Sequence, residues 1–143
     1  MSNNKTKQDI LKQNGLKVTS TRVWMLKLFK DSRAPLNAEK LHKKMAGRGA
    51  DLATIYRNLE TFLEKNLIRK VDLGGNFTSY ELSENHHHHI VCKKCGLVED
   101  FNLYPNKCVI DRISKKILRS SSYFDRIMEH SFELFGVCRK CQD

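Results

Sequence analysis

The chain has 143 residues, 40% of them hydrophobic, which is enough apolar material for a folded core and argues against global disorder. No apolar run approaches the roughly 18 residues that a membrane-spanning helix needs, and the polar N-terminus lacks the apolar stretch of a signal peptide, so we expect a cytosolic protein without a membrane partner. The net charge of +10 is uneven, with +8 on residues 1–82 and +2 on residues 83–143, and this pattern fits either a nucleic-acid partner or a solvated basic surface.

The first part of the chain predicts four short helices followed by a β-hairpin. The helices are expected at residues 5–14, 20–31, 38–46 and 52–65. Thr19, Asn37 and Asp51 can cap the last three. Two strand-like runs follow at 67–73 and 77–82, and Gly74-Gly75-Asn76 between them suits a tight hairpin. This order is typical of a winged helix-turn-helix, whose last helix enters the major groove of DNA.

The fourth predicted helix has an apolar and a polar side. Its apolar stripe consists of Leu52, Ile55, Leu59, Phe62 and Leu63. The polar side is free of acidic residues, and the side chains expected to contact DNA there and on the hairpin are Thr54, Tyr56, Arg57, Asn58, Arg69 and Lys70. Arginine and asparagine can hydrogen-bond base edges, and a tyrosine ring can contact a thymine methyl. The solvated face of a protein-interaction module would show the same pattern, so that alternative stays open.

The second part of the chain, from about residue 84, has a different character. It predicts a strand at 97–101, a helix at 108–119 and an alternating strand at 127–137. The residues expected to face inward from the helix are Ile110, Ile113 and Ile117. A lobe of about 60 residues buries little surface, so we expect it to need a metal ion, a partner subunit or both.

Four of the five cysteines form two Cys-x-x-Cys pairs, Cys92 with Cys95 and Cys138 with Cys141. Thiolates at this spacing form chelating turns, and two such turns complete a closed tetrahedral zinc site that has no open position for catalysis. We therefore predict a structural zinc, with two separate thiol pairs acting as a redox switch as the alternative. The fifth cysteine, Cys108, is expected to pack as a small hydrophobic residue without a functional role.

A run of four histidines, His86–His89, precedes the first cysteine pair. In an extended segment alternate histidines point to opposite sides, so the run could serve two metal sites, although a solvated polar turn is the alternative. Carboxylates that could complete a mixed nitrogen and oxygen site are Glu81, Glu99 and Asp100. By itself, His130 on an apolar strand face is more typical of a core residue than of a ligand.

Enzyme signatures are absent from the sequence. A zinc deaminase would need His-x-Glu and Pro-Cys-x-x-Cys, but Val91 precedes Cys92. A zincin would need His-Glu-x-x-His, which does not occur. We therefore expect neither catalysis nor a small-molecule substrate.

Taken together, these residues resemble the ferric uptake regulator family over nearly the whole chain. Each single motif is weak, but the ordered set is specific. The set comprises Leu16-Lys17-Val18-Thr19-x-x-Arg22, Asn37-Ala38-Glu39, Asp51–Leu59, Tyr80-Glu81-Leu82, the histidine run leading into Cys92-x-x-Cys95-Gly96, and His130 followed by Gly136-Val137-Cys138-x-x-Cys141.

The resemblance implies an α+β homodimer that binds palindromic DNA operators when a metal corepressor is loaded. Residues 1–83 would form a winged-helix DNA-binding domain, and residues 84–143 a small α/β dimerisation domain holding the structural zinc. A second divalent metal (Zn, Fe or Mn) would occupy a regulatory site between the domains, formed by Glu81, His87, His89 and Asp100. A further site would draw on His86, His88 and His130.

Two departures from the family pattern concern these sites. Pro35 stands where the family often places a regulatory histidine, so the regulatory site would have one ligand fewer or borrow one. In the further site, His88 and Lys107 replace an aspartate and a glutamate, which makes that site richer in nitrogen if it forms. The alternative from another class is a zinc-stabilised interaction or thiol-redox protein without specific DNA readout.

Overall fold

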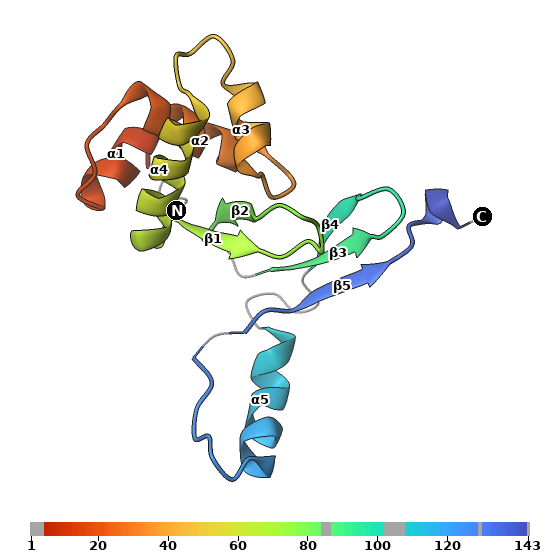
Figure 1. The fold of residues 1–143 in the computed structure, drawn as a ribbon. Helices are drawn as coiled ribbons and strands as arrows, with labels where there is room; N and C mark the ends of the chain where they lie inside the picture. Colours follow the sequence, from red (N-terminus) through yellow and green to blue (C-terminus); the bar gives the residue numbers. More distant parts are fainter. Residues whose placement is uncertain (1–4, 84–86, 102–107, 129, 143) are drawn as a thin grey trace. The chain divides into compact units, whose positions relative to one another are not determined.

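The computed structural model describes residues 5–83, 87–101, 108–128 and 130–142 (Figure 1). The chain divides into two compact units, Met1–Glu84 and Asn85–Asp143. Within the described residues, every helix is too short or too polar to cross a lipid bilayer.

The first unit begins with four helices. Their bounds are α1 Lys7–Gln13, α2 Ser20–Asp31, α3 Ala38–Lys44 and α4 Leu52–Glu64. At the start of α3 the Lys40 N–H donates to Asn37 Oδ1 at 2.8 Å, and at the start of α4 the Thr54 N–H donates to Asp51 Oδ1 at 2.8 Å. Thr19 caps α2 in the same way. The four predicted helices and the three predicted caps are therefore confirmed. Each cap accepts a hydrogen bond from a backbone N–H that has no partner within the helix.

Side chains from all four helices and from the hairpin meet in one hydrophobic core. The predicted stripe of α4 supplies its centre with three buried residues, Ile55, Leu59 and Phe62. Leu52, at the first turn, is 37% exposed, so the stripe begins one turn later than predicted. Other buried residues of this core include Leu11, Met25, Leu41 and Met45. Burying one side of α4 leaves its polar side at the surface.

Asn37→Ala should lower the free energy of unfolding by about 1 kcal/mol, because α3 loses the oxygen that accepts from Lys40 N–H. Urea denaturation followed by helix ellipticity measures this change. Asn37→Asp keeps an accepting oxygen at the same position and should unfold close to the wild type. Equal losses in both variants would show that the cap contributes nothing to stability.

A β-hairpin follows α4, with strands β1 Ile68–Val71 and β2 Ser79–Leu82 paired antiparallel. The strands are shorter than the predicted runs 67–73 and 77–82, because the connection begins at Asp72, whose Oδ1 accepts from Gly74 N–H at 2.8 Å. Leu36 forms an antiparallel bridge to Tyr80, with both N–H to carbonyl distances at 2.9 Å. The helices and the attached hairpin form the predicted winged helix-turn-helix arrangement.

The second unit contains a small mixed sheet. Its elements are β3 His88–Cys92, β4 Val98–Phe101, α5 Val109–Ser120, β5 Glu133–Gly136 and the 3-10 turn η1 Arg139–Cys141. The strand order is β4-β3-β5, with β3 antiparallel to β4 and parallel to β5. The predicted strand at 127–137 is therefore too long. Among the described residues of this run, Glu133–Gly136 form the strand, and they lie opposite His89–Cys92 of β3.

The helix α5 shows a second difference from the prediction. Ile113 and Ile117, expected to face inward, are 42% and 46% exposed. Tyr123 and Phe124, just after the helix, are also exposed. The periodicity of α5 therefore marks an apolar surface of the single chain rather than part of its core.

Candidate metal centres and nucleic-acid interface

Four cysteines converge at one end of the sheet in the second unit. Cys92 ends β3, Cys95 lies in the turn to β4, and Cys138 and Cys141 flank and end η1. The turn is tight, since Gly96 adopts a φ of 75° and donates its N–H to the Cys92 carbonyl at 2.9 Å. The parallel pairing of Cys92 with Gly136 brings the second cysteine pair beside the first.

The sulfur geometry fits a tetrahedral metal ion. All four Sγ atoms lie within 4.8 Å of one another, and Cys95 Sγ lies 3.7 Å from Cys138 Sγ. Zinc–sulfur bonds of about 2.3 Å in a tetrahedron place the sulfurs about 3.8 Å apart. Lys94 Nζ donates to the Cys141 carbonyl at 2.8 Å and links the two chelating turns. The cluster thus has the donors and the spacing of a closed zinc site.

The acidities of two of these thiols differ strongly. Backbone N–H groups, first that of Cys138 at 3.3 Å and then that of Cys95, stabilise the thiolate and lower the pKa of Cys92 to about 6. Hydrogen bonds with Cys138 and Cys95 raise the pKa of Cys141 to about 12. The lowered pKa favours the thiolate form of Cys92, whereas the raised pKa favours the thiol form of Cys141. A bound divalent cation would stabilise all four cysteines as thiolates at the same time.

Three of the four predicted regulatory residues belong to the second unit. Asp100 on β4 pairs across the ladder with His89 on β3, and His89 Nε2 lies 3.4 Å from Asp100 Oδ1. The rings of His87 and His89 meet edge to face, with centroids 4.9 Å apart. His89 is buried, whereas Asp100 is exposed. These side chains offer imidazole and carboxylate donors on one part of the sheet.

The fourth predicted regulatory residue, Glu81, lies on β2 of the first unit. It stands opposite Arg69 in the hairpin, and Arg69 Nε donates to Glu81 Oε1 at 2.6 Å. Glu81 is nearly buried, and Arg69 is half-buried. Glu81, which was predicted to bind a metal, therefore forms an ion pair with Arg69, which was predicted to contact DNA.

The further predicted site gains a residue that sequence reasoning missed. His88 Nε2 and His130 Nε2 each lie 3.1 Å from Cys108 Sγ. Cys108 is buried and is the N-cap of α5, so it packs as expected but also contacts both histidines. His86 and Lys107 lie outside the described residues. The only sequence signal for Cys108 is that it directly follows Lys107, and Lys107 stands at the position where the family pattern has a ligand.

The polar side of α4 presents some of the predicted DNA-binding residues and not others. Tyr56 is 47% exposed, and Arg57 is exposed with its Nε 3.4 Å from the Ala53 carbonyl. Thr54 is half-buried, and Lys70 on β1 is exposed. Tyr56, Arg57 and Lys70 are therefore available to a nucleic-acid partner.

Asn58 is engaged inside the first unit. Its Oδ1 accepts from Arg22 Nε at 2.9 Å, and its Nδ2 donates to the Thr54 carbonyl at 2.9 Å. Arg22 also donates to the Lys17 carbonyl at 3.1 Å. The Asn58 amide thus joins α4 to α2 and to the segment before it. Sequence reasoning treated this residue as a base reader and could not see its partner 36 residues away.

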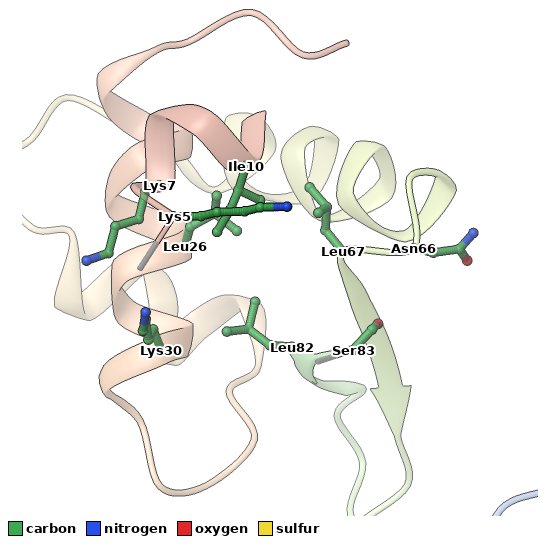
Figure 2. Close-up of a pocket in the computed structure, with 9 residues that line it drawn as sticks. All are labelled: Lys5, Lys7, Ile10, Leu26, Lys30, Asn66, Leu67, Leu82 and Ser83. Atoms are coloured by element: carbon green, nitrogen blue, oxygen red, sulfur yellow. The ribbon is translucent and has the colours of Figure 1, made fainter. Parts of the chain in front are cut away.

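A small cavity of about 150 Å³ lies in the first unit between α1, α2 and the end of the hairpin (Figure 2). Its lining is mainly apolar and comes from Ile10, Leu26, Leu67 and Leu82, with added positive charge from Lys5, Lys7 and Lys30. The described part of the lining contains no imidazole, thiol or carboxylate. The cavity is therefore separate in chemistry from the metal-binding clusters.

Comparison with known proteins agrees with this arrangement. Residues 13–135 match the sequence model of the ferric uptake regulator family. The chain is 34% identical over 139 residues to the ferric uptake regulation protein of Legionella pneumophila, covering 92% of this chain and 96% of that protein. It is 28% identical over 135 residues to the peroxide-responsive repressor PerR of Staphylococcus aureus, covering 93% and 87%. The structure of the ferric uptake regulator from Francisella tularensis with iron superposes with a TM-score of 0.72 at 30% identity, covering 90% of this chain and 96% of that one.

Proposed function

Because this chain belongs to the ferric uptake regulator family, we propose that it is a metal-responsive transcriptional repressor that binds palindromic operator DNA as a homodimer. One observation carries the DNA-binding role: Tyr56 and Arg57 are displayed on α4 of a basic winged-helix unit. Arginine at such a position can donate two hydrogen bonds to a guanine, and the tyrosine ring can contact a thymine methyl. The function is regulation of transcription rather than catalysis.

The homodimer is supported by the apolar surface of the second unit. Ile113 and Ile117 on α5 are about half exposed, and Tyr123 and Phe124 follow them at the surface. A second copy of the chain that covered these side chains would remove apolar area from water, which is favourable at about 25 cal/mol per Å². It would also place two α4 helices on one DNA molecule, as a palindrome requires.

We assign the structural zinc to Cys92, Cys95, Cys138 and Cys141. Four thiolates leave no open coordination position, so the ion would serve only to join the end of β3 to η1. Zinc supplies no catalytic chemistry in such a site.

The regulatory metal is assigned to Glu81, His87, His89 and Asp100. Imidazole and carboxylate donors suit Zn, Fe and Mn and bind more weakly than thiolates, so the ion can exchange, as a sensor requires. Glu81 belongs to the first unit and the other three residues to the second. Ion binding at these residues would shift the chain toward the form that binds operator DNA.

Metal-dependent DNA binding tests this proposal. The chain, with its structural zinc retained, is mixed with labelled DNA from upstream of its own gene at fixed salt, and fluorescence anisotropy is followed as Zn, Fe(II), Mn and Ni are added in turn. We expect tight binding to appear with one of these ions, which then identifies the signal. His87→Ala combined with His89→Ala should remove the response to that ion, because two of the four donors are lost.

The exposed His42 on α3 supplies the matched control, and His42→Ala should respond like the wild type. A normal metal response in the double variant would refute the assigned regulatory site. Salt-sensitive binding that is equal on all DNA sequences would instead favour a zinc-stabilised interaction or thiol-redox protein without operator recognition.

A further inference from the structure

The β-hairpin of the first unit contains an ion pair between Arg69 and Glu81. The two residues lie directly opposite each other in the β1–β2 ladder. Arg69 Nε donates to Glu81 Oε1 at 2.6 Å, and a second guanidinium nitrogen, Nη2, contacts the same oxygen. Both partners are ionised and the guanidinium donors are fixed in one plane, so this contact belongs to the stronger class of protein hydrogen bonds.

The ion pair is largely shielded from water. The Glu81 side chain is 11% exposed and the Arg69 side chain 33%. Val71 and Ser79, the next pair on the same side of the ladder, are 4% and 7% exposed. A carboxylate in these surroundings needs a nearby cation, because burying an unpaired charge is costly. Arg69 supplies that cation in the metal-free chain.

Glu81 is also one of the four residues that we assign to the regulatory metal. A carboxylate has only two oxygens, so a metal ion bound to Glu81 would be a close neighbour of the Arg69 guanidinium. Two cations at short range repel each other, and the repulsion is stronger where water is scarce. Metal binding at Glu81 therefore has to overcome either this repulsion or the loss of the Arg69 contact.

We propose that Arg69 competes with the regulatory metal for Glu81 and so sets the metal concentration at which the chain responds. This inference rests on the proposed regulatory site. Arg69 neutralises Glu81 while the metal concentration is low, and the metal takes over that role when its concentration rises. Because the two cations oppose each other, removing the charge of Arg69 should tighten metal binding.

Manganese titration of the chain, with its structural zinc retained, measures this competition. Mn(II) suits oxygen and nitrogen donors better than thiolates, and the electron paramagnetic resonance signal of free Mn(II) gives the unbound concentration. Arg69→Gln should bind Mn(II) roughly tenfold or more tightly than the wild type, because the competing charge is gone. Arg69→Met, a second neutral variant that keeps an aliphatic stem, should show the same gain. Arg69→Lys keeps a cation beside Glu81 and should stay within about threefold of the wild type.

Lys70→Gln is the matched control. Lys70 is exposed, follows Arg69 in the chain and stands opposite Tyr80 in the ladder. Its charge is screened by solvent, so its loss should change the Mn(II) affinity by less than about threefold. Far-UV circular dichroism checks that the metal-free variants keep their fold. The proposal is wrong if the two neutral Arg69 variants bind Mn(II) no more tightly than the wild type, or if Lys70→Gln gains as much as they do.

A double-variant cycle shows whether Arg69 acts through Glu81. Glu81→Gln removes a metal ligand and should weaken Mn(II) binding. Adding Arg69→Gln to that variant should bring less than about a threefold gain, because the carboxylate for which the two cations compete is absent. An undiminished gain in the Glu81→Gln background would show that Arg69 acts only through general charge, which would overturn the proposal.

Combining His87→Ala with His89→Ala separates this inference from the function on which it rests. That variant should lose its Mn(II) affinity. If the affinity survives, the assigned regulatory site is wrong, and the competition at Glu81 is wrong with it. If the affinity is lost but the neutral Arg69 variants gain nothing, only the competition is wrong. These titrations contain no DNA, so a failure of operator binding would overturn the repressor role and leave the competition standing.

Discussion

Replacing Cys92 with serine should unfold the second unit while the first unit stays folded. Among the described residues of the second unit, only Val91, Cys92 and Cys108 are buried hydrophobic side chains, whereas the first unit has a core drawn from all of its elements. Structural zinc in small domains contributes an apparent 10–16 kcal/mol, which here must replace the missing core. Cys92 is the most buried of the four ligands and also accepts the Cys138 N–H.

Hydrogen exchange read by mass spectrometry locates the expected damage. In Cys92→Ser, amide protection should be lost over residues 88–101 and 133–136 and retained over residues 52–64. A strong chelator acting on the wild type should give the same pattern. Cys108→Ser is the matched control, because it changes a buried cysteine of the same unit outside the four-cysteine cluster and should retain the structural zinc. Retained protection over 88–101 in Cys92→Ser would mean that this unit folds without the metal.

Arg57→Ala should weaken binding to the operator by roughly 30-fold to 10⁴-fold. A lost arginine–base contact costs about 1–3 kcal/mol. A palindrome engages both copies of Arg57 in the dimer, so the total is about 2–6 kcal/mol. The Arg57 side chain is exposed and makes one long contact to the Ala53 carbonyl, so its replacement should not disturb the fold. Anisotropy titrations at one salt concentration measure the affinity.

Arg33, exposed between α2 and α3, provides the comparison. Arg33→Ala removes the same charge from the same unit without touching α4, so it should change the affinity for operator and for unrelated DNA by similar small factors. Arg57→Ala should lower the affinity for the operator far more than for unrelated DNA. Equal losses in the two variants would show that Arg57 contributes only charge and reads no base.

The first unit was predictable from sequence because its signals are local. Thr19, Asn37 and Asp51 each cap the helix that they were expected to cap, and the stripe on α4 is buried at Ile55 and Phe62. A cap involves residues three positions apart, and a stripe repeats every turn, so both can be read along the chain. The second unit depends on strand pairing between distant segments, which explains the missed β3 and the overlong final strand.

The same distinction explains which parts of the sites could be predicted. The cysteine pairs were recognised because a chelating turn is a local motif. Cys108 was missed because its two imidazole partners lie 20 and 22 residues away in the sequence. Asn58 and Arg69 were expected at the surface from their positions on a helix and a hairpin. Their internal partners, Arg22 and Glu81, come from other elements that a face pattern does not reveal.

The parallel pairing of β3 with β5 also sets the order in which the molecule can assemble. The β1–β2 hairpin closes over a few residues, but β3 and β5 are joined through residues 93–132. Closing a loop of that length costs about 3 kcal/mol in chain entropy, and non-local pairing of this kind is slow. Each Cys-x-x-Cys turn is local and can capture zinc before the strands meet. The supply of zinc would then govern how long the unpaired strands β3 and β5 stay exposed and aggregation-prone during biosynthesis.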